Sequence, residues 1–208
     1  MFGQLLDLLL PPRCGGCGAL GALYCEACRG AIRRLEEPDR ARFKRLSRLR
    51  SAALYEGPLE KALHRFKYEG RRPLAGPLAL LIAERLAVEG LAAEAIAWVP
   101  LHPRRQRSRG YNQSELLARE LARLTRLPLR PGLQRTRDTP PQVGLDRLRR
   151  AANVVRAFRW VGPPLAGGPL LLVDDVATTG ATLDACATAL REAGAGAVTG
   201  FTVARVKL

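Results

Sequence analysis

The stretch LLLVDDVATTGATL, residues 170–183, constrains the fold of this 208-residue chain more than any other. Its apolar run LLLV is typical of a buried strand, and Asp174 and Asp175 follow at the point where that strand would end. The small residues ATTGAT then lead into a segment with helical character. A strand, an acid pair, a hydroxyl-rich turn and a helix in this order predict an α/β unit with its ligand beyond the carboxyl end of the strand.

The acid pair and the turn behind it carry a chemical expectation. Carboxylates buried at a strand end are costly without partners, so a cation or a hydroxyl group should meet Asp174 and Asp175. Backbone N–H groups of the turn, together with the positive end of the helix, are suited to hold a phosphate. A ribose 5-phosphate fits this span, with its hydroxyls on the aspartates. The alternative is an ordinary helix N-cap. The turn residues are Ala177, Thr178, Thr179, Gly180, Ala181 and Thr182.

Apolar strands and amphipathic helices alternate along the rest of the chain. This alternation predicts an α/β fold with a mostly parallel sheet flanked by helices. We expect strands at residues 51–55, 95–101, 169–176 and 197–206, and helices at residues 57–70, 73–91, 112–127 and 180–195. Residues 1–50 are expected to form a small N-terminal segment with a helical linker, and residues 51–208 one larger domain.

Positive charge is concentrated in one part of the chain. The formal net charge is +15, and residues 101–160 hold fifteen Arg against four Asp or Glu, a surplus of eleven. Guanidinium groups bind phosphate oxygens in paired hydrogen bonds, so the cluster predicts a polyanionic ligand such as pyrophosphate or nucleic acid. A solvated charged face is the alternative for any single Arg. The candidates are Arg104, Arg105, Arg107 and Arg109 after one strand, and Arg135, Arg137, Arg147, Arg149 and Arg150 in and around a long loop over residues 134–152.

The N-terminal residues bear on the location of the chain. They lack a basic region, and Asp7 interrupts their apolar stretch, so we do not expect a signal peptide. No apolar run reaches the length of about 18 residues that a membrane span needs. We therefore expect a cytoplasmic protein that reaches the inner face of the membrane only through partner proteins.

Two CxxC pairs near the N-terminus predict a metal site. Cys14 and Cys17 form the first pair, and Cys25 and Cys28 form the second, seven residues further on. This spacing is typical of a compact tetrathiolate site for structural zinc, with no coordination position open for catalysis. Two disulfides are the alternative, which the absence of an export signal disfavours. A redox-active pair is a further alternative for a single CxxC.

Several motifs resemble those of known families. LLLVDDVATTGATL is similar to the phosphoribosyl-pyrophosphate (PRPP) binding motif of type I phosphoribosyltransferases. Nearly the whole chain resembles the ComF family, which is associated with natural competence and DNA uptake in bacteria. This second resemblance rests on the four cysteines and on FKYEG at residues 66–70, VPLHPRRQRSRGYNQSELLARELA at residues 99–122 and RTRDTPPQVGLDRLRRAANVVRAF at residues 135–158.

The resemblance implies a role for each candidate site. Asp174 and Asp175 would hold the ribose hydroxyls with Mg²⁺ nearby, and the turn at residues 177–182 would hold the 5-phosphate. The Arg cluster after Val99 would bind pyrophosphate, and the loop at residues 134–152 would close over PRPP.

Two functions from different classes follow from these features. The first is Mg²⁺-dependent transfer of a phosphoribosyl group, or its reverse, in which Arg104, Arg105 and Arg109 stabilise the pyrophosphate. The acceptor of such a transfer is not specified by the sequence, and neither is the oligomeric state.

The second function is that of a non-enzymatic module of the competence machinery that binds single-stranded DNA in the same basic cleft. Bases would then stack on Tyr68, Tyr111 or Phe66. The cysteine segment would contact a helicase or an uptake-channel protein, or would only stabilise the fold. A fold that retains neither activity is a third possibility.

Overall fold

A four-stranded parallel sheet forms the centre of the protein. The computed structural model describes residues 11–35, 43–136 and 157–207. The strands β1 (Arg48–Leu54), β6 (Val198–Arg205), β5 (Leu170–Ala177) and β2 (Ala95–Trp98) lie in the order β1-β6-β5-β2. All three neighbouring pairs are parallel, which confirms the prediction of a parallel sheet.

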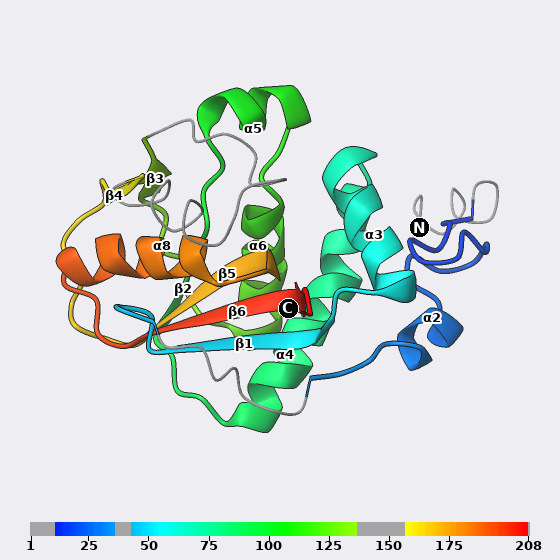
Figure 1. Cartoon of the computed structure of the whole chain (residues 1–208), viewed down its shortest axis with the longest axis horizontal. Coiled ribbons are helices and arrows are strands. Elements are labelled where there is room, and N and C mark those ends of the chain that lie inside the picture. Colours follow the sequence, from blue (N-terminus) through cyan, green and yellow to red (C-terminus); the bar gives the residue numbers. More distant parts are fainter. Residues whose placement is uncertain (1–10, 36–42, 137–156, 208) are drawn as a thin grey trace.

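Helices cover both faces of this sheet. On one face α3 (Gly57–Tyr68), α4 (Ala75–Glu89) and α6 (Gln113–Thr125) share a core with Leu171 and Val173 of β5. On the other face α8 (Ala181–Glu192) packs over Leu170 and Leu172 (Figure 1). Because successive side chains of a strand point to opposite faces, an unbroken apolar run such as that of β5 requires cover on both sides.

A small antiparallel sheet and a short helix add to this frame. The strands β3 (Leu133–Arg135) and β4 (Phe158–Trp160) pair with each other and pack on the α8 side of the central sheet. The helix α5 (Pro103–Arg109) follows β2 and carries part of the basic cluster. We expected a loop after Val99, where α5 lies, and a long loop over residues 134–152, where β3 occupies the first residues and residues 137–152 lie outside the described ones. A three-residue strand and a polar seven-residue helix lack a readable apolar period.

The cysteine segment docks on α3. A Cβ added to Gly15 would lie 2.6 Å from the Leu74 side chain, and one added to Gly16 would lie 2.7 Å from Cys28 Sγ and 3.0 Å from Pro58 of α3, so a larger residue would displace a neighbour. Leu74 belongs to the short 3-10 helix η1 (Arg72–Leu74). Cys25 is the N-cap residue of α2 (Glu26–Gly30), and Cys28 lies within that helix. Figure 1 shows this segment beside α3, at the end of the sheet toward which the strand arrows point.

Candidate phosphate and ribose site

The acid pair lies at the carboxyl end of β5 and has two polar partners. The Lys67 ammonium of α3 lies 2.9 Å from Asp175 Oδ1, and the Ser114 hydroxyl of α6 donates a 2.7 Å hydrogen bond to Asp174 Oδ1. The backbone N–H of Asp175 also donates to Asp174 Oδ1 at 2.9 Å. The expectation that a cation and a hydroxyl group meet the two carboxylates is confirmed.

The two carboxyl groups of the acid pair have different electrostatic surroundings. Burial, and then the neighbouring Asp175 charge, raise the pKa of Asp174 to about 7, although the Ser114 hydroxyl acts in the opposite direction. Burial alone would lower the pKa of Lys67, but the Asp175 carboxylate outweighs it and the pKa is raised. The lysine therefore stays charged at neutral pH, and Asp174 is poised to exchange a proton for a cation or a ligand hydroxyl.

The turn after β5 encloses a cavity of about 180 Å³. Its walls are Lys67, Asp174 and every residue from Val176 to Leu183, which includes all six predicted turn residues. Gly180 has a φ of 79° and precedes α8, so the first turn of the helix opens toward this cavity. A Cβ on Gly180 would lie 2.6 Å from the ring of Phe43, which fixes a glycine here on two grounds.

A second cavity of about 240 Å³ adjoins the first. Its walls include the basic side chains Arg105 and Arg109 of α5 and Arg135 of β3. Residues 99–101, after β2, form part of the same wall. Both cavities share Lys67, Asp174 and Thr182, so the acid pair lies between a hydroxyl-rich turn and an Arg-lined cleft.

The other basic candidates fall elsewhere. Arg104 and Arg107 are exposed on α5 and are absent from the described walls of both cavities. Arg137, Arg147, Arg149 and Arg150 lie outside the described residues. The part of the chain that the structure describes thus brings three of the Arg candidates, Arg105, Arg109 and Arg135, to the acid pair.

The three aromatic residues proposed to stack with bases differ in their exposure to solvent. Phe66 has 0% and Tyr111 7% of its surface exposed, and the Tyr111 hydroxyl donates to the Phe66 carbonyl, so both belong to the core. The hypothesis that bases stack on these two rings is wrong, because no ring face is accessible. Tyr68 is 64% exposed at the rim of the second cavity, with the Arg109 guanidinium 4.9 Å from its ring centre.

The site also contains residues that the sequence did not single out. Lys67 and Ser114 contact the acid pair. Asn112 holds the start of α6, which carries Ser114, against the residue that follows β2. The Asn112 amide donates to the Val99 carbonyl at 3.0 Å, while its oxygen accepts the Ser114 backbone N–H at the start of α6. The only sequence signal for this arrangement is the pattern Asn-x-Ser-Glu before an amphipathic helix, which is typical of an N-cap.

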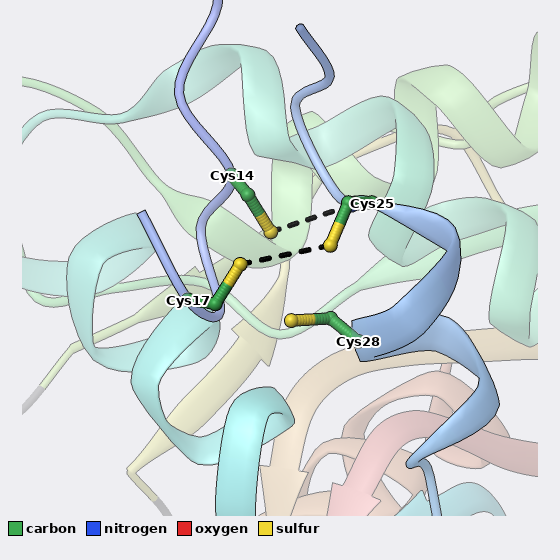
Figure 2. Close-up of side chains that lie close together, drawn as sticks. All are labelled: Cys14, Cys17, Cys25 and Cys28. Carbon is green, nitrogen blue, oxygen red and sulfur yellow. Dashed lines mark hydrogen bonds between the residues drawn. The ribbon is translucent and has the colours of Figure 1, made fainter. Parts of the chain in front are cut away.

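The four predicted metal ligands come together. The sulfur atoms of Cys14, Cys17, Cys25 and Cys28 all lie within 4.8 Å of one another and point toward a common centre (Figure 2). Cys17 Sγ lies 3.6 Å from Cys25 Sγ, close to the separation of about 3.8 Å that four sulfurs 2.3 Å from one ion would have. The donor set therefore fits a single tetrahedral metal ion.

The surroundings of the first ligand favour a thiolate. The Cys25 backbone N–H donates to Cys14 Sγ at 3.3 Å. Burial raises the pKa of the Cys14 thiol, but the backbone donors of Cys25, Cys17 and Gly16 outweigh it and lower the pKa to about 6. Thiolates are the form that binds metal, so Cys14 is suited to be a ligand. Burial and the neighbouring cysteines instead raise the pKa of Cys28.

The fold is that of an α/β protein with a parallel sheet. It has a candidate phosphate site at the strand-end acid pair and a candidate metal site at the N-terminal cysteine cluster. No family model matches the chain. It is 35% identical over 198 residues to DNA utilization protein YhgH of Escherichia coli (strain K12), covering 92% of this chain and 82% of that protein. It is 32% identical over 191 residues to competence protein F of Haemophilus influenzae, covering 88% and 80%. The chain therefore belongs to the family of these two proteins, the ComF family.

Solved structures give weaker likenesses. Glutamine PRPP amidotransferase from B. subtilis has a TM-score of 0.45 and 23% identity over 64% of this chain and 26% of that one. UMP synthase of Leishmania donovani has a TM-score of 0.37 and 17% identity over 77% and 28%. The chain spans about a quarter of the length of each. Within the described residues, no helix combines the length and apolar character needed to cross a membrane.

Proposed function

We propose that the two adjoining cavities form a binding site for PRPP, with the 5-phosphate in the turn and the pyrophosphate in the Arg-lined cleft. This proposal rests on the position of the acid pair between two cavities, one lined by the turn and the other by Arg side chains. The two cavities share Lys67, Asp174 and Thr182. PRPP has the same order of groups, because its ribose hydroxyls lie between a monophosphate and a pyrophosphate.

Each part of the site has a chemical task in this proposal. The backbone of residues 177–182 and the first turn of α8 receive the 5-phosphate. Asp174 and Asp175 accept hydrogen bonds from the ribose hydroxyls. Arg105 and Arg109 compensate the charge of the pyrophosphate with guanidinium donors.

Magnesium fits the acid pair by donor chemistry. Carboxylate and phosphate oxygens are the ligands that Mg²⁺ prefers, and the pair offers carboxylate oxygens at the edge of the cleft. When bound, Mg²⁺ would supply positive charge to the pyrophosphate. An enzymatic version of the function is phosphoribosyl transfer with pyrophosphate as the leaving group, and its acceptor is not identified by the residues of the cleft.

We also propose structural zinc for the cysteine cluster and a role in DNA uptake for the whole chain. The fit of four convergent sulfurs to one tetrahedral ion supports zinc. The names of the two relatives, DNA utilization protein and competence protein, support the role in DNA uptake. In this role the protein would act in the cytoplasm, where thiols stay reduced, and a helicase or an uptake-channel protein is the expected partner class.

Calorimetric titration of PRPP tests the proposed site. The wild type is titrated with and without Mg²⁺, beside the double variant Asp174→Asn, Asp175→Asn. We expect Mg²⁺-dependent binding that the double variant loses. Glu115→Gln is the matched control, because this carboxylate lies next to Ser114 in α6 but is absent from the described walls of both cavities. Absence of binding in the wild type, or equal binding in the double variant, contradicts the proposal.

Single-stranded DNA binding is a second candidate function, and one observation favours it. Tyr68 presents an exposed ring at the rim of the cleft, with the Arg109 guanidinium 4.9 Å from its centre, and proteins that bind single strands combine such rings with nearby cationic groups. The cavity wall continues from this ring to Arg105 and Arg135, so a strand that stacks on Tyr68 would find further cationic groups.

Fluorescence anisotropy with a labelled oligonucleotide tests this second function. Tyr68→Ala should weaken binding by about 1–3 kcal/mol, and Tyr68→Phe, which keeps the ring, should change it little. Binding should also weaken steeply with salt, since Arg contacts to phosphates release counterions. Equal affinities of the Ala and Phe variants would show that the ring is not a stacking platform.

A further inference from the structure

Four consecutive residues at the end of α3 each contact a different part of the molecule. Arg65 binds the cysteine segment, and the Phe66 carbonyl accepts the Tyr111 hydroxyl in the core. Lys67 pairs with Asp175, and Tyr68 lies under Arg109. One helical turn thus joins the cysteine cluster to the candidate ligand cleft.

The contact with the cysteine segment is specific. Arg65 Nη1 donates to the Cys14 carbonyl at 3.0 Å and to the Gly15 carbonyl at 2.9 Å. These carbonyls belong to the loop that begins at Cys14 and ends at Cys17. A metal ion bound to the cysteines would hold this loop in place, and with it the two carbonyls that accept from Arg65. Steric contacts reinforce the arrangement, since a Cβ on Gly15 would lie 3.3 Å from Ala62, one turn earlier in α3.

The contacts with the cleft are equally direct. The side chains of Lys67 and Asp175 are only 18% and 12% exposed, so their ion pair is largely shielded from water. Lys67 forms part of the wall of both cavities, and Tyr68 forms part of the rim of the second. A small rotation or fraying of the last turn of α3 would therefore displace two cleft residues together.

We infer that Arg65 is a positioning residue that couples the cysteine cluster to ligand binding in the cleft. With metal bound to the four sulfurs, the Cys14 and Gly15 carbonyls hold Arg65, and the last turn of α3 presents Lys67 and Tyr68 to the ligand. Without metal, the loop releases Arg65 and the turn loosens. Coupling of this kind is reciprocal, so ligand in the cleft also strengthens metal binding at the cysteines.

The ligand part of this inference rests on the proposed function, whereas the link between cysteines and helix does not. Amide hydrogen exchange of residues 62–69 measures the link without any ligand. We expect that removing the metal with a chelator and a mercurial reagent accelerates exchange in this peptide by about tenfold, and that Arg65→Ala does the same while metal is still bound. Unchanged exchange in both cases would overturn the inference.

Arg71→Ala is the matched control. Arg71 also donates to a carbonyl of the cysteine segment, that of Arg13, but it lies beyond the end of α3. This variant should leave exchange of residues 62–69 within about twofold of the wild type, whereas Arg65→Lys, which keeps one charged donor, should fall between Arg65→Ala and the wild type. Equal acceleration of exchange in the Arg71 and Arg65 variants would contradict a specific role of Arg65, because any loosening of the cysteine segment would then have the same effect.

A titration of PRPP with Mg²⁺ then tests the transmission to the cleft. Affinity should fall about five- to tenfold in Arg65→Ala, and saturating PRPP should slow metal release to a chelator by a similar factor in the wild type only. A purely structural role of Arg65 would not make metal release depend on PRPP. If the metal-loaded wild type binds no PRPP, the proposed function fails, and the exchange experiment still decides the link between the cysteines and α3.

Discussion

Replacing Asp174 by Asn should remove a pH dependence from the stability of the ligand-free protein. The pKa of Asp174 is raised from its ordinary value of 3.8 to about 7 by burial and by the Asp175 charge. The folded protein therefore keeps this proton up to about neutral pH, whereas the unfolded chain loses it near pH 4. Because the folded state binds more protons between these values, the free energy of unfolding falls as pH rises from about 4 to 7.

The size of this effect follows from the shift. A change of about three pKa units corresponds to at most about 4 kcal/mol of unfolding free energy between pH 4 and pH 8. Asp174 is partly open to the cleft, so solvent screening reduces the expected effect to about 2 kcal/mol. Asn keeps an oxygen acceptor for the Ser114 hydroxyl and carries no charge at any of these pH values. The variant should therefore exceed the wild type in stability at pH 8 and lose most of this advantage at pH 5.

Urea denaturation at four pH values between 5 and 8 measures the difference between the two proteins. Ser114→Ala is an informative companion, because the Ser114 hydroxyl lowers the pKa of Asp174 and its removal should extend the loss of stability to higher pH. A difference between wild type and Asp174→Asn that stays constant from pH 5 to pH 8 would refute the assignment of a raised pKa to this carboxyl group.

Three substitutions test other parts of the structure by urea denaturation and PRPP titration. Lys67→Met leaves the Asp175 carboxylate without its ion-pair partner and should cost about 3 kcal/mol of stability, together with affinity for PRPP. Gly180→Ala places a Cβ against Phe43 at a φ of 79°, so it should cost about 1–2 kcal/mol and weaken PRPP binding by displacing the turn that lines the first cavity. Phe201→Ala empties a fully buried position of β6 and should cost about 3–5 kcal/mol, with PRPP affinity unchanged at temperatures where the variant is folded. Stability within about 0.5 kcal/mol of the wild type would contradict the packing argument for any of the three.

The sequence predicts those parts of the fold that arise from local patterns. The LLLV run predicts a strand covered on both faces. The helical spacing of Leu59, Leu63 and Phe66 predicts the buried side of α3, so it already argues against the stacking hypothesis for Phe66. The same helical period places Tyr68 away from that side, and this residue is indeed exposed. Tyr111 has no such pattern around it. Its hydroxyl donates to the Phe66 carbonyl of α3, so its buried position depends on a helix that is distant in sequence.

The candidate site is predictable to a similar degree. The order of strand, acid pair, turn and helix predicts that Asp174 and the turn lie at one site, and they line the same cavity. The partners of the pair come from α3 and α6, and nothing local to Lys67 or Ser114 marks them as neighbours of β5. The choice among the basic residues is also a tertiary property, since only the position of α5 decides that Arg105 and not Arg104 faces the cleft.

The acid pair limits how a DNA strand could use the cleft. A phosphodiester oxygen can only accept hydrogen bonds, so it cannot donate one to these carboxyl groups, and deoxyribose lacks the 2′-hydroxyl that could. A strand therefore gains nothing from Asp174 and Asp175, and its favourable contacts lie at the rim, where Tyr68 and Arg109 stack. In the proposed site, a ribose ring that carries both hydroxyls would gain from the pair and would lie deeper in the cleft. The two proposed ligands thus depend on different residues, and both depend on the end of α3, because Lys67 and Tyr68 are consecutive in that helix.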